Sequence, residues 1–322
     1  MKITATLTAI VLLGAAAESA LAQNFPNKPL RLVTQFRAGS SGSNTFRVVA
    51  EEWGKVLGQP MVVDDKPGAG GMLASVHVAN SEPDGYTILG ATAGPFTTYK
   101  FLSKKVEMDP NAVLTPVTKC GESTVMLGAS AGAPFSSLKQ LLEYAKSNPG
   151  KVTYGTSGVG SPHHLSGEQI QQITGVQLRH VPYKASAAAL LDTVSGQLMS
   201  TFSIYSVTVP HIKSGKIRPI AAIRAERATQ MPDVPTITEV IPAFELPPSW
   251  TGFFLPVKTP KEIVQRLNAA ANQAMNVKEA REKLLKGGFE LQPGTPEQLA
   301  ALIKRQTALV AKIVKSAGIK PR

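Results

Sequence analysis

Short apolar runs alternate with stretches of helical periodicity along most of the chain. The first run, residues 30–33, is followed by a loop of small residues and then by a helical pattern over 47–57. Further apolar runs lie at 60–64, 86–90, 125–127, 152–155, 178–181, 198–204 and 218–223. This β–loop–α order predicts an α/β fold in which mainly parallel sheets are flanked by helices. Ligands of such folds bind beyond the carboxyl ends of the strands.

Two loops of small polar residues each join a predicted strand to a predicted helix. The first spans 36–44 and the second spans 156–164. Backbone N–H groups in such loops can bind an anion. Because the two loops are well separated in the chain, we expect two lobes that face each other. The predicted lobes are 23–122 with 250–322, and 123–249.

The last part of the chain is predicted to be helical. Thr259 and Thr295 each precede a Pro and, three residues on, a Glu or Gln, which is the pattern of an N-terminal cap. In the final helix an apolar stripe is expected to pack against the core; it consists of Leu299, Leu302, Ile303, Leu309 and Ile313.

The first 22 residues have the pattern of a secretory signal peptide. Met1-Lys2 is a short basic start, residues 3–17 are mostly apolar, and Ala20-Leu21-Ala22 matches the pattern before a cleavage site. We therefore expect cleavage after Ala22 and a periplasmic location; retention as an N-terminal anchor is the alternative. No other stretch approaches about 18 uninterrupted apolar residues, so the mature protein is expected to be soluble.

The charge of the chain is strongly positive but scattered. The formal net charge is +12 at pH 7, yet no basic run is longer than Lys104-Lys105 and aromatic residues make up only 6%. A nucleic-acid partner is therefore not expected, and a surface that attracts small anions is the simpler interpretation. The single cysteine, Cys120, cannot form an internal disulfide and is predicted to be a buried thiol.

No arrangement of residues indicates bond-breaking chemistry. The chain contains no G-x-S-x-G elbow, HExxH, Walker loop or GxGxxG pattern. Adjacent histidines point apart on a helix, so His163 and His164 are not expected to share a metal ion. The glycine run at 68–71 is as consistent with a tight turn as with ligand contact. The sequence predicts no enzyme, no cofactor and no metal site.

Seven motifs then occur in an order that is typical of one family. They are Phe36-x-Ala38-Gly39, Asp65-Lys66-Pro67-Gly68-Ala69-Gly70-Gly71, Pro83-Asp84-Gly85-Tyr86-Thr87, Lys151-x-Thr153-Tyr154-Gly155, His180-Val181-Pro182-Tyr183-Lys184, Pro210-His211-Ile212-Lys213-x-Gly215-Lys216 and Pro232-Asp233-Val234-Pro235-Thr236. With these motifs the mature chain resembles the substrate-binding receptors of tripartite tricarboxylate transporters, the Bug family of periplasmic solute-binding proteins. The resemblance implies a two-lobed, type II-like periplasmic-binding-protein fold that closes on an organic carboxylate in the interlobe cleft. It also implies delivery to membrane permease subunits, and we expect a monomer.

The resemblance places one ligand carboxylate between the two small-residue loops. Hydroxyl and N–H groups suit this task because they bind an anion without a competing countercharge. The candidate ligand-binding residues are Phe36, Arg37, Ala38, Gly39, Ser40, Ser41, Ser43, Asn44, Thr92, Ser157, Gly158, Ser161, His163, His164 and Ser203.

The chain departs from the family pattern at informative positions. Family members usually read Phe-Pro-Ala-Gly-Gly-Ser-Thr-Asp in the first loop; here Arg37 replaces Pro, Ser40 replaces the second Gly and Ser43 replaces Asp. A second frequent acid aligns with Ser203. The loss of both acids favours a dicarboxylate ligand, for example an aromatic one such as terephthalate. Arg37 either binds its second carboxylate or faces solvent.

Two other functions remain open at this point. A sensor subunit that docks to a signalling receptor would share the fold and the ligand. A periplasmic enzyme would need an acid–base pair in the cleft, and none can be named after the loss of the two acids. In each case we expect closure around hinge segments near 121–124 and 249–251.

Overall fold

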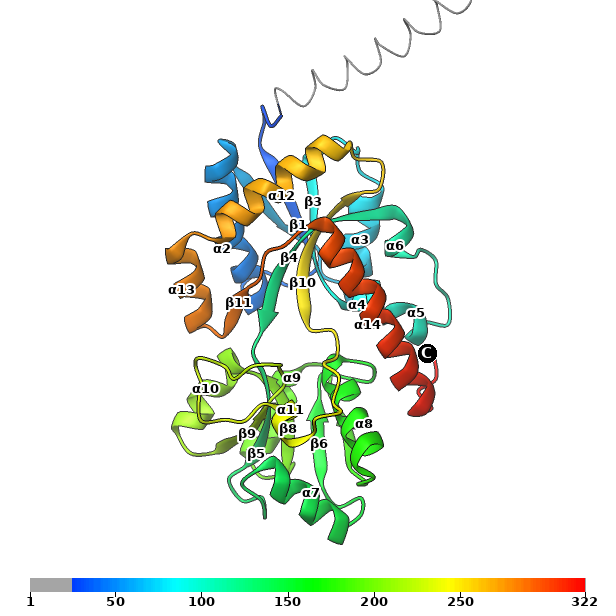
Figure 1. Cartoon of the computed structure of the whole chain (residues 1–322), viewed down its shortest axis with the longest axis vertical. Helices are drawn as coiled ribbons and strands as arrows, with labels where there is room; N and C mark the ends of the chain where they lie inside the picture. The colour runs from blue at the N-terminus through cyan, green and yellow to red at the C-terminus, as the bar shows by residue number, and fades with distance from the viewer. Residues whose placement is uncertain (1–24, 322) are drawn as a thin grey trace, which may run out of the picture.

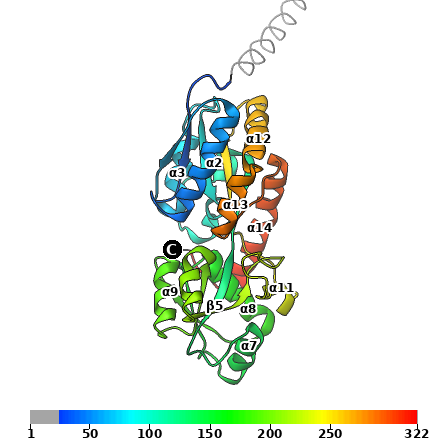
Figure 2. The same cartoon turned by 90° about the vertical axis from the view of Figure 1, so that its left-hand side faces the viewer.

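The computed structural model describes residues 25–321, and the expected signal peptide and its cleavage site lie outside the described residues. The chain forms two lobes stacked along its longest axis, each built on one sheet (Figures 1 and 2). In spatial order, the sheet of the first lobe comprises β11 (Phe289–Leu291), β4 (Leu114–Ser123), β10 (Trp250–Pro256), β3 (Thr87–Thr92), β1 (Leu30–Thr34) and β2 (Met61–Asp65). The sheet of the second lobe comprises β7 (Arg179–Pro182), β6 (Thr153–Thr156), β8 (Ser200–Ile204), β5 (Val125–Ser130) and β9 (Ile217–Ala222).

Helices cover both sheets, as the alternating pattern predicts. Those of the first lobe are α2 (Ser41–Leu57), the short 3-10 turn η1 (Ala69–Gly71), α3 (Met72–Ala79), α4 (Gly94–Thr97), α5 (Tyr99–Leu102), α6 (Pro110–Val113), α12 (Lys261–Met275), α13 (Lys278–Lys286) and α14 (Pro296–Ser316). Those of the second lobe are α7 (Leu138–Ser147), α8 (Pro162–Thr174), α9 (Ser186–Val194), α10 (Tyr205–Lys213) and α11 (Ile237–Val240).

The sheets are mixed, so the expectation of mainly parallel strands holds for only part of each. In the first lobe β1 is parallel to β2 and β3, whereas β10 is antiparallel to both of its neighbours. In the second lobe β6 is parallel to β7 and β8, whereas β5 is antiparallel to both of its neighbours. The antiparallel strands β4, β5 and β10 adjoin the segments in which the chain passes between lobes, where no βα crossover sets their direction.

Helices bury both faces of the first sheet. Consecutive residues of β10 point to opposite faces and so pack in different clusters. Phe253 packs with Trp53 of α2 and Leu267 of α12 on one face. Phe254 packs on the other face, in the cluster that holds residues of α3 and α14. Every residue of β10 is buried, which accounts for the absence of charged side chains from this strand.

Cys120 lies in the core of the first lobe, as the sequence predicts. Burial raises the pKa of its thiol to about 12, so the group remains protonated at neutral pH.

The two lobes meet where β4 ends and β5 begins. The Thr124 N–H donates to the Gly288 carbonyl at 2.7 Å. Arg224 of the second lobe forms an ion pair with Glu290 of the first lobe, and its guanidinium also donates to Thr124 Oγ1 at 3.3 Å. The expected hinge segments and lobe boundaries fall in this region and stay predictions.

The C-terminal helix α14 begins in the first lobe and reaches the second. Thr295 caps it through a reciprocal pair of hydrogen bonds with Gln298, as expected. Thr259 does not cap α12, because that helix begins one residue later with Pro260 as its N-cap residue. The apolar stripe of α14 packs inward, and its last turns pack against Leu165 of α8.

We predict that Gly121→Ala destabilises the fold. A Cβ atom at Gly121 would lie 2.1 Å from the Glu290 carbonyl oxygen, so the pairing of β4 with β11 would have to shift. We expect the free energy of unfolding in urea to fall by about 1–3 kcal/mol.

Gly132→Ala is the matched control, since a Cβ atom there meets nothing within 4 Å. Equal stability of the two variants would contradict the close approach of β11 to β4.

Candidate functional site

A cavity of about 370 Å³ lies between the lobes. It opens beyond the carboxyl ends of β1, β3, β6 and β8, where α/β folds bind their ligands. Both lobes and the crossing segments contribute to its wall. The lining residues are Phe36, Ser41, Gly42, Thr45, Phe46, Thr92, Ala93, Gly94, Ser123, Val125, Ser157, Pro162, His163, Ile204, Ser206, Pro248, Ser249, Trp250, Thr251, Gly287 and Phe289.

Three of the longer helices begin at this cavity: α2, α8 and α10. The first N–H groups of a helix have no acceptor within the helix and carry a partial positive charge. Ser40 caps α2 by accepting from the Ser43 N–H, and Ser161 caps α8 by accepting from the His164 N–H. None of the three helices has an acidic residue in its first turn that would offset this partial charge. The cavity wall is therefore electropositive without a basic side chain.

The lining side chains are hydroxyls and apolar groups, and His163 alone among them can titrate between pH 4 and 8. Burial lowers the pKa of His163 to about 4, so its imidazole is neutral at neutral pH. The Phe36 ring packs edge-on against Phe46, with ring centroids 5.5 Å apart, and the indole of Trp250 donates to Gln306 Oε1 at 2.6 Å. These contacts orient the aromatic part of the wall.

The structure brings five of the sequence-predicted residues together at the cavity: Phe36, Ser41, Thr92, Ser157 and His163. Four others shape the small-residue loops: Ala38 and Gly39 in the first, Ser40 and Ser161 as caps. Gly158 adopts φ 117° in the second loop, and its carbonyl accepts from Ser161 Oγ at 2.7 Å.

The remaining candidates lie outside the cavity lining. Arg37 is exposed beside the Pro67–Gly71 turn, and Asn44 is exposed on α2. His164 is buried behind the second loop. The Ser203 hydroxyl is buried with no hydrogen-bond partner among the described residues.

Ser43 has a different task from the one suggested by its place in the motif. Its side chain is fully buried, and its hydroxyl donates to Asp65 at 2.8 Å. The Asp65 carboxylate also binds the Arg47 guanidinium at 2.6 Å. These bonds fasten the first turn of α2 to the end of β2. Ser43 therefore serves the contact between α2 and β2 and does not line the cavity.

Sequence reasoning missed several lining hydroxyls, notably those of Thr45, Ser206 and Ser249. Ser206 lies two residues after the end of β8, so the strand-end rule could have identified it. Thr45 could not be found in this way, because α2 begins at Ser41 rather than at the predicted residue 47. Its glycine and serine residues resemble a loop, yet they form the first helical turn.

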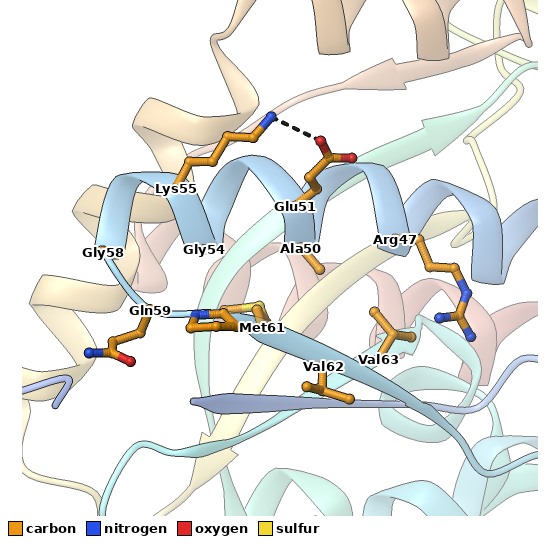
Figure 3. Close-up of a pocket in the computed structure, with 11 residues that line it drawn as sticks. Arg47, Ala50, Glu51, Gly54, Lys55, Gly58, Gln59, Met61, Val62 and Val63 are labelled. Atoms are coloured by element: carbon orange, nitrogen blue, oxygen red, sulfur yellow. Dashed lines mark hydrogen bonds and ion pairs between the residues drawn. The ribbon is translucent and has the colours of Figure 1, made fainter. Parts of the chain in front are cut away.

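A larger hollow, about 650 Å³, lies on the outer side of the first lobe between α2 and β2 (Figure 3). One lobe alone lines it, and its charged groups already have partners: the Lys55 ammonium lies 2.9 Å from the Glu51 carboxylate, and Arg47 binds Asp65. The interlobe cavity is therefore the better candidate site.

Within residues 25–321, no group of three or more His, Cys, Asp or Glu residues is placed to hold a metal ion. In the same part of the chain, no helix has both the length and the apolar character needed to cross a membrane.

Comparison with known families gives a match over residues 45–319 to the tripartite tricarboxylate transporter family receptor. A Cupriavidus necator relative, the UPF0065 protein in the gbd 5' region, is 33% identical over 314 residues, covering 96% of this chain and 94% of the relative. Protein BugT of Bordetella pertussis is 30% identical over 301 residues, covering 93% and 92%.

Solved structures are similar over most of both chains. R. palustris Rpa4515 with adipate is 31% identical, with a TM-score of 0.81 over 92% of this chain and 100% of the other. MatC (Rpa3494) from Rhodopseudomonas palustris with bound malate is 29% identical, with a TM-score of 0.74 over 90% and 100%.

We predict that Asp65→Asn destabilises the protein, because the variant loses the charge that binds Arg47 and weakens the bond from Ser43. The Asp65 side chain is only 8% exposed, so we expect a loss of about 1–3 kcal/mol in urea unfolding at neutral pH. Glu107→Gln is the control, since both partners of the Lys105–Glu107 pair are largely exposed and its loss should cost less than about 1 kcal/mol. Similar losses in both variants would contradict the anchoring role of Asp65.

We also predict that His163 contributes to acid sensitivity. Its pKa is about 4 in the folded state and about 6.5 in an unfolded chain, so the unfolded state binds the proton first as the pH falls. The stability that comes from keeping His163 neutral is present above about pH 6.5 and is lost towards about pH 4, a change of about 2–3 kcal/mol.

Urea unfolding of wild type and His163→Gln at about pH 7 and about pH 4.5 checks this expectation. The wild type should lose more stability than the variant over this range. His211→Gln, on α10, controls for the removal of a histidine as such. Parallel losses in wild type and His163→Gln would show that His163 is not responsible.

Proposed function

This chain belongs to the receptor family of tripartite tricarboxylate transporters, and we propose that it is a periplasmic solute-binding protein for a small dicarboxylate. In this proposal the two lobes close on the ligand. The protein then delivers it to the membrane subunits of such a transporter.

One observation carries the proposal: the cavity presents hydroxyls and helix N-termini from both lobes, and its lining includes no Lys, Arg, Asp or Glu. Neutral donors and helix N-termini stabilise an anion, and a carboxylate in the wall would repel it. A ligand with an ammonium group would find no carboxylate to pair with. The lining thus favours an acid over an amino acid.

Two features support a dicarboxylate in particular. Donors come from both lobes, with Ser41 and Thr92 in the first lobe and Ser157 and Ser206 in the second. Apolar groups such as Phe36 and Phe289 lie beside them and suit a hydrocarbon body. Rpa4515 and MatC, whose structures hold adipate and malate, are similar over nearly their whole length. Terephthalate is one aromatic member of the same class.

The direct test is a thermal-shift panel of adipate, malate and terephthalate against monocarboxylates and amino acids, followed by titration calorimetry. A bound ligand at about a hundred times its dissociation constant adds about 2.7 kcal/mol of stability. Tighter binding of a monocarboxylate or an amino acid than of every dicarboxylate would overturn the proposal.

We predict that Ser41→Asp weakens binding of the best dicarboxylate by about tenfold or more, because it places a like charge at the first position of α2. An acid in a first helical turn stabilises the helix, so the ligand-free fold should persist. Ser41→Asn, which has a similar size and no charge, is the control and should bind nearly as well as the wild type. Equal affinities for the Asp and Asn variants would place the carboxylates away from α2.

A further inference from the structure

Three histidines form hydrogen bonds with the loop of residues 157–161 or with the residue just before it. Ser157 Oγ lies 3.2 Å from His163 Nδ1 at the cavity. Thr156 Oγ1, just before the loop, lies 2.7 Å from His180 Nε2. The third histidine, His164, lies directly under the loop and lines no part of the cavity.

The hydrogen bonds of His164 define its tautomer. Its Nδ1 atom accepts the Gly160 N–H at 2.9 Å, so this nitrogen carries no proton. Its Nε2 atom lies 3.3 Å from the Glu168 carboxylate and is therefore the protonated nitrogen that donates to it. The side chain is only 7% exposed, so water cannot readily replace either partner.

The groups that face His164 come from each element packed around it. His180 of β7 stacks on the imidazole with ring centroids 4.0 Å apart. The Tyr154 hydroxyl of β6 donates to Glu168 at 2.9 Å. Burial opposes ionisation of Glu168, but the bonds from His164 and Tyr154 outweigh it and lower the pKa of this carboxyl. Leu165, the next residue of α8, packs in an apolar cluster with residues of α5 and α14 from the first lobe.

Gly160 is also the point at which the loop touches the first lobe. Its φ of 76° lies in the left-handed region, and a Cβ atom there would lie 2.0 Å from Leu102 Cδ1. The loop therefore fits between His164 on one side and α5 on the other. A displacement of Gly160 would move Ser157 and the start of α8, which line the cavity.

We propose that His164 is a positioning residue for ligand binding and that its protonation releases the ligand. Neutral His164 accepts the Gly160 N–H and holds the 157–161 loop at the cavity. A proton on Nδ1 turns this acceptor into a donor that opposes the Gly160 N–H, while Glu168 stabilises the imidazolium through Nε2. The loop loses its anchor, and ligand affinity falls on acidification. This inference rests on the proposed function, because it assumes that the cavity binds the ligand.

Two substitutions separate the two nitrogens of His164. In His164→Asn the amide oxygen stands at the same number of bonds from Cα as Nδ1, so it can accept the Gly160 N–H. In His164→Gln the amide reaches towards Glu168 and leaves Gly160 without an acceptor. Neither side chain titrates.

The first measurement uses the ligand-free protein and follows the exchange protection factor of the Gly160 amide by NMR. We expect protection in wild type and His164→Asn, and about tenfold less in His164→Gln, the equivalent of one lost hydrogen bond. Measured at about pH 8 and about pH 5, protection in the wild type should also be lower at the acidic pH, and that of His164→Asn should not.

The second measurement titrates adipate and malate into the same three proteins over the same pH range. His164→Gln should bind about tenfold more weakly than His164→Asn at neutral pH. Because the dicarboxylates themselves take up a proton on acidification, all three proteins should lose some affinity, and the loss should be larger in the wild type than in either variant.

The possible failures are distinguishable. Equal protection of Gly160 in all three proteins, or equal acid sensitivity of binding in wild type and His164→Asn, would overturn the role of His164. Absence of carboxylate binding by the wild type would instead overturn the proposed function, and the exchange measurement would still decide whether His164 holds the loop.

Discussion

The N–H groups at the starts of α2, α8 and α10 are the constraint on which the site depends. They have no acceptor within their helices, and all three helices begin at the cavity between the lobes. A wall built in this way can hold an anion only if nothing in it carries a competing charge. The lining residues meet this condition, with hydroxyls for polarity and a neutral His163. The small residues of both loops follow from the same constraint, because larger ones would cover the N–H groups. Gly42 is small for a separate reason, since a Cβ atom there would lie 2.6 Å from the Phe36 ring.

Much of the fold could be predicted from the sequence, because apolar strands and amphipathic helices leave periodic patterns. The residues at which helices begin were harder to predict. The first turns of α2 and α8 consist of Ser, Gly, Pro and His, which resemble loop residues, so both helices begin earlier than their apolar patterns indicate. β4 was missed as a strand of ten residues because polar side chains alternate along it irregularly.

The site was predictable at the level of loops but not of side chains. The strand-end rule indicated the loops that carry Phe36 and Ser157, and both residues line the cavity. It could not indicate that Ser43 points to Asp65, because that contact depends on how α2 is rotated above β2. For the same reason the cap at Thr295 was predictable and the absence of a cap at Thr259 was not, since one residue of shift moves the hydroxyl away from the helix end.

The packing of α14 against α8 bears on the kind of motion that the lobes can make. Leu165 of the second lobe is fully buried among Val310, Ile313 and Val314 of the C-terminal helix. A motion that pulled the lobes straight apart would expose these side chains to water, at a cost of about 25 cal/mol for each Å² uncovered. A twist about the axis of α14 would keep them covered while the cavity mouth widens. The packing of α14 against α8 therefore favours an opening in which the lobes twist relative to each other over one in which they move straight apart.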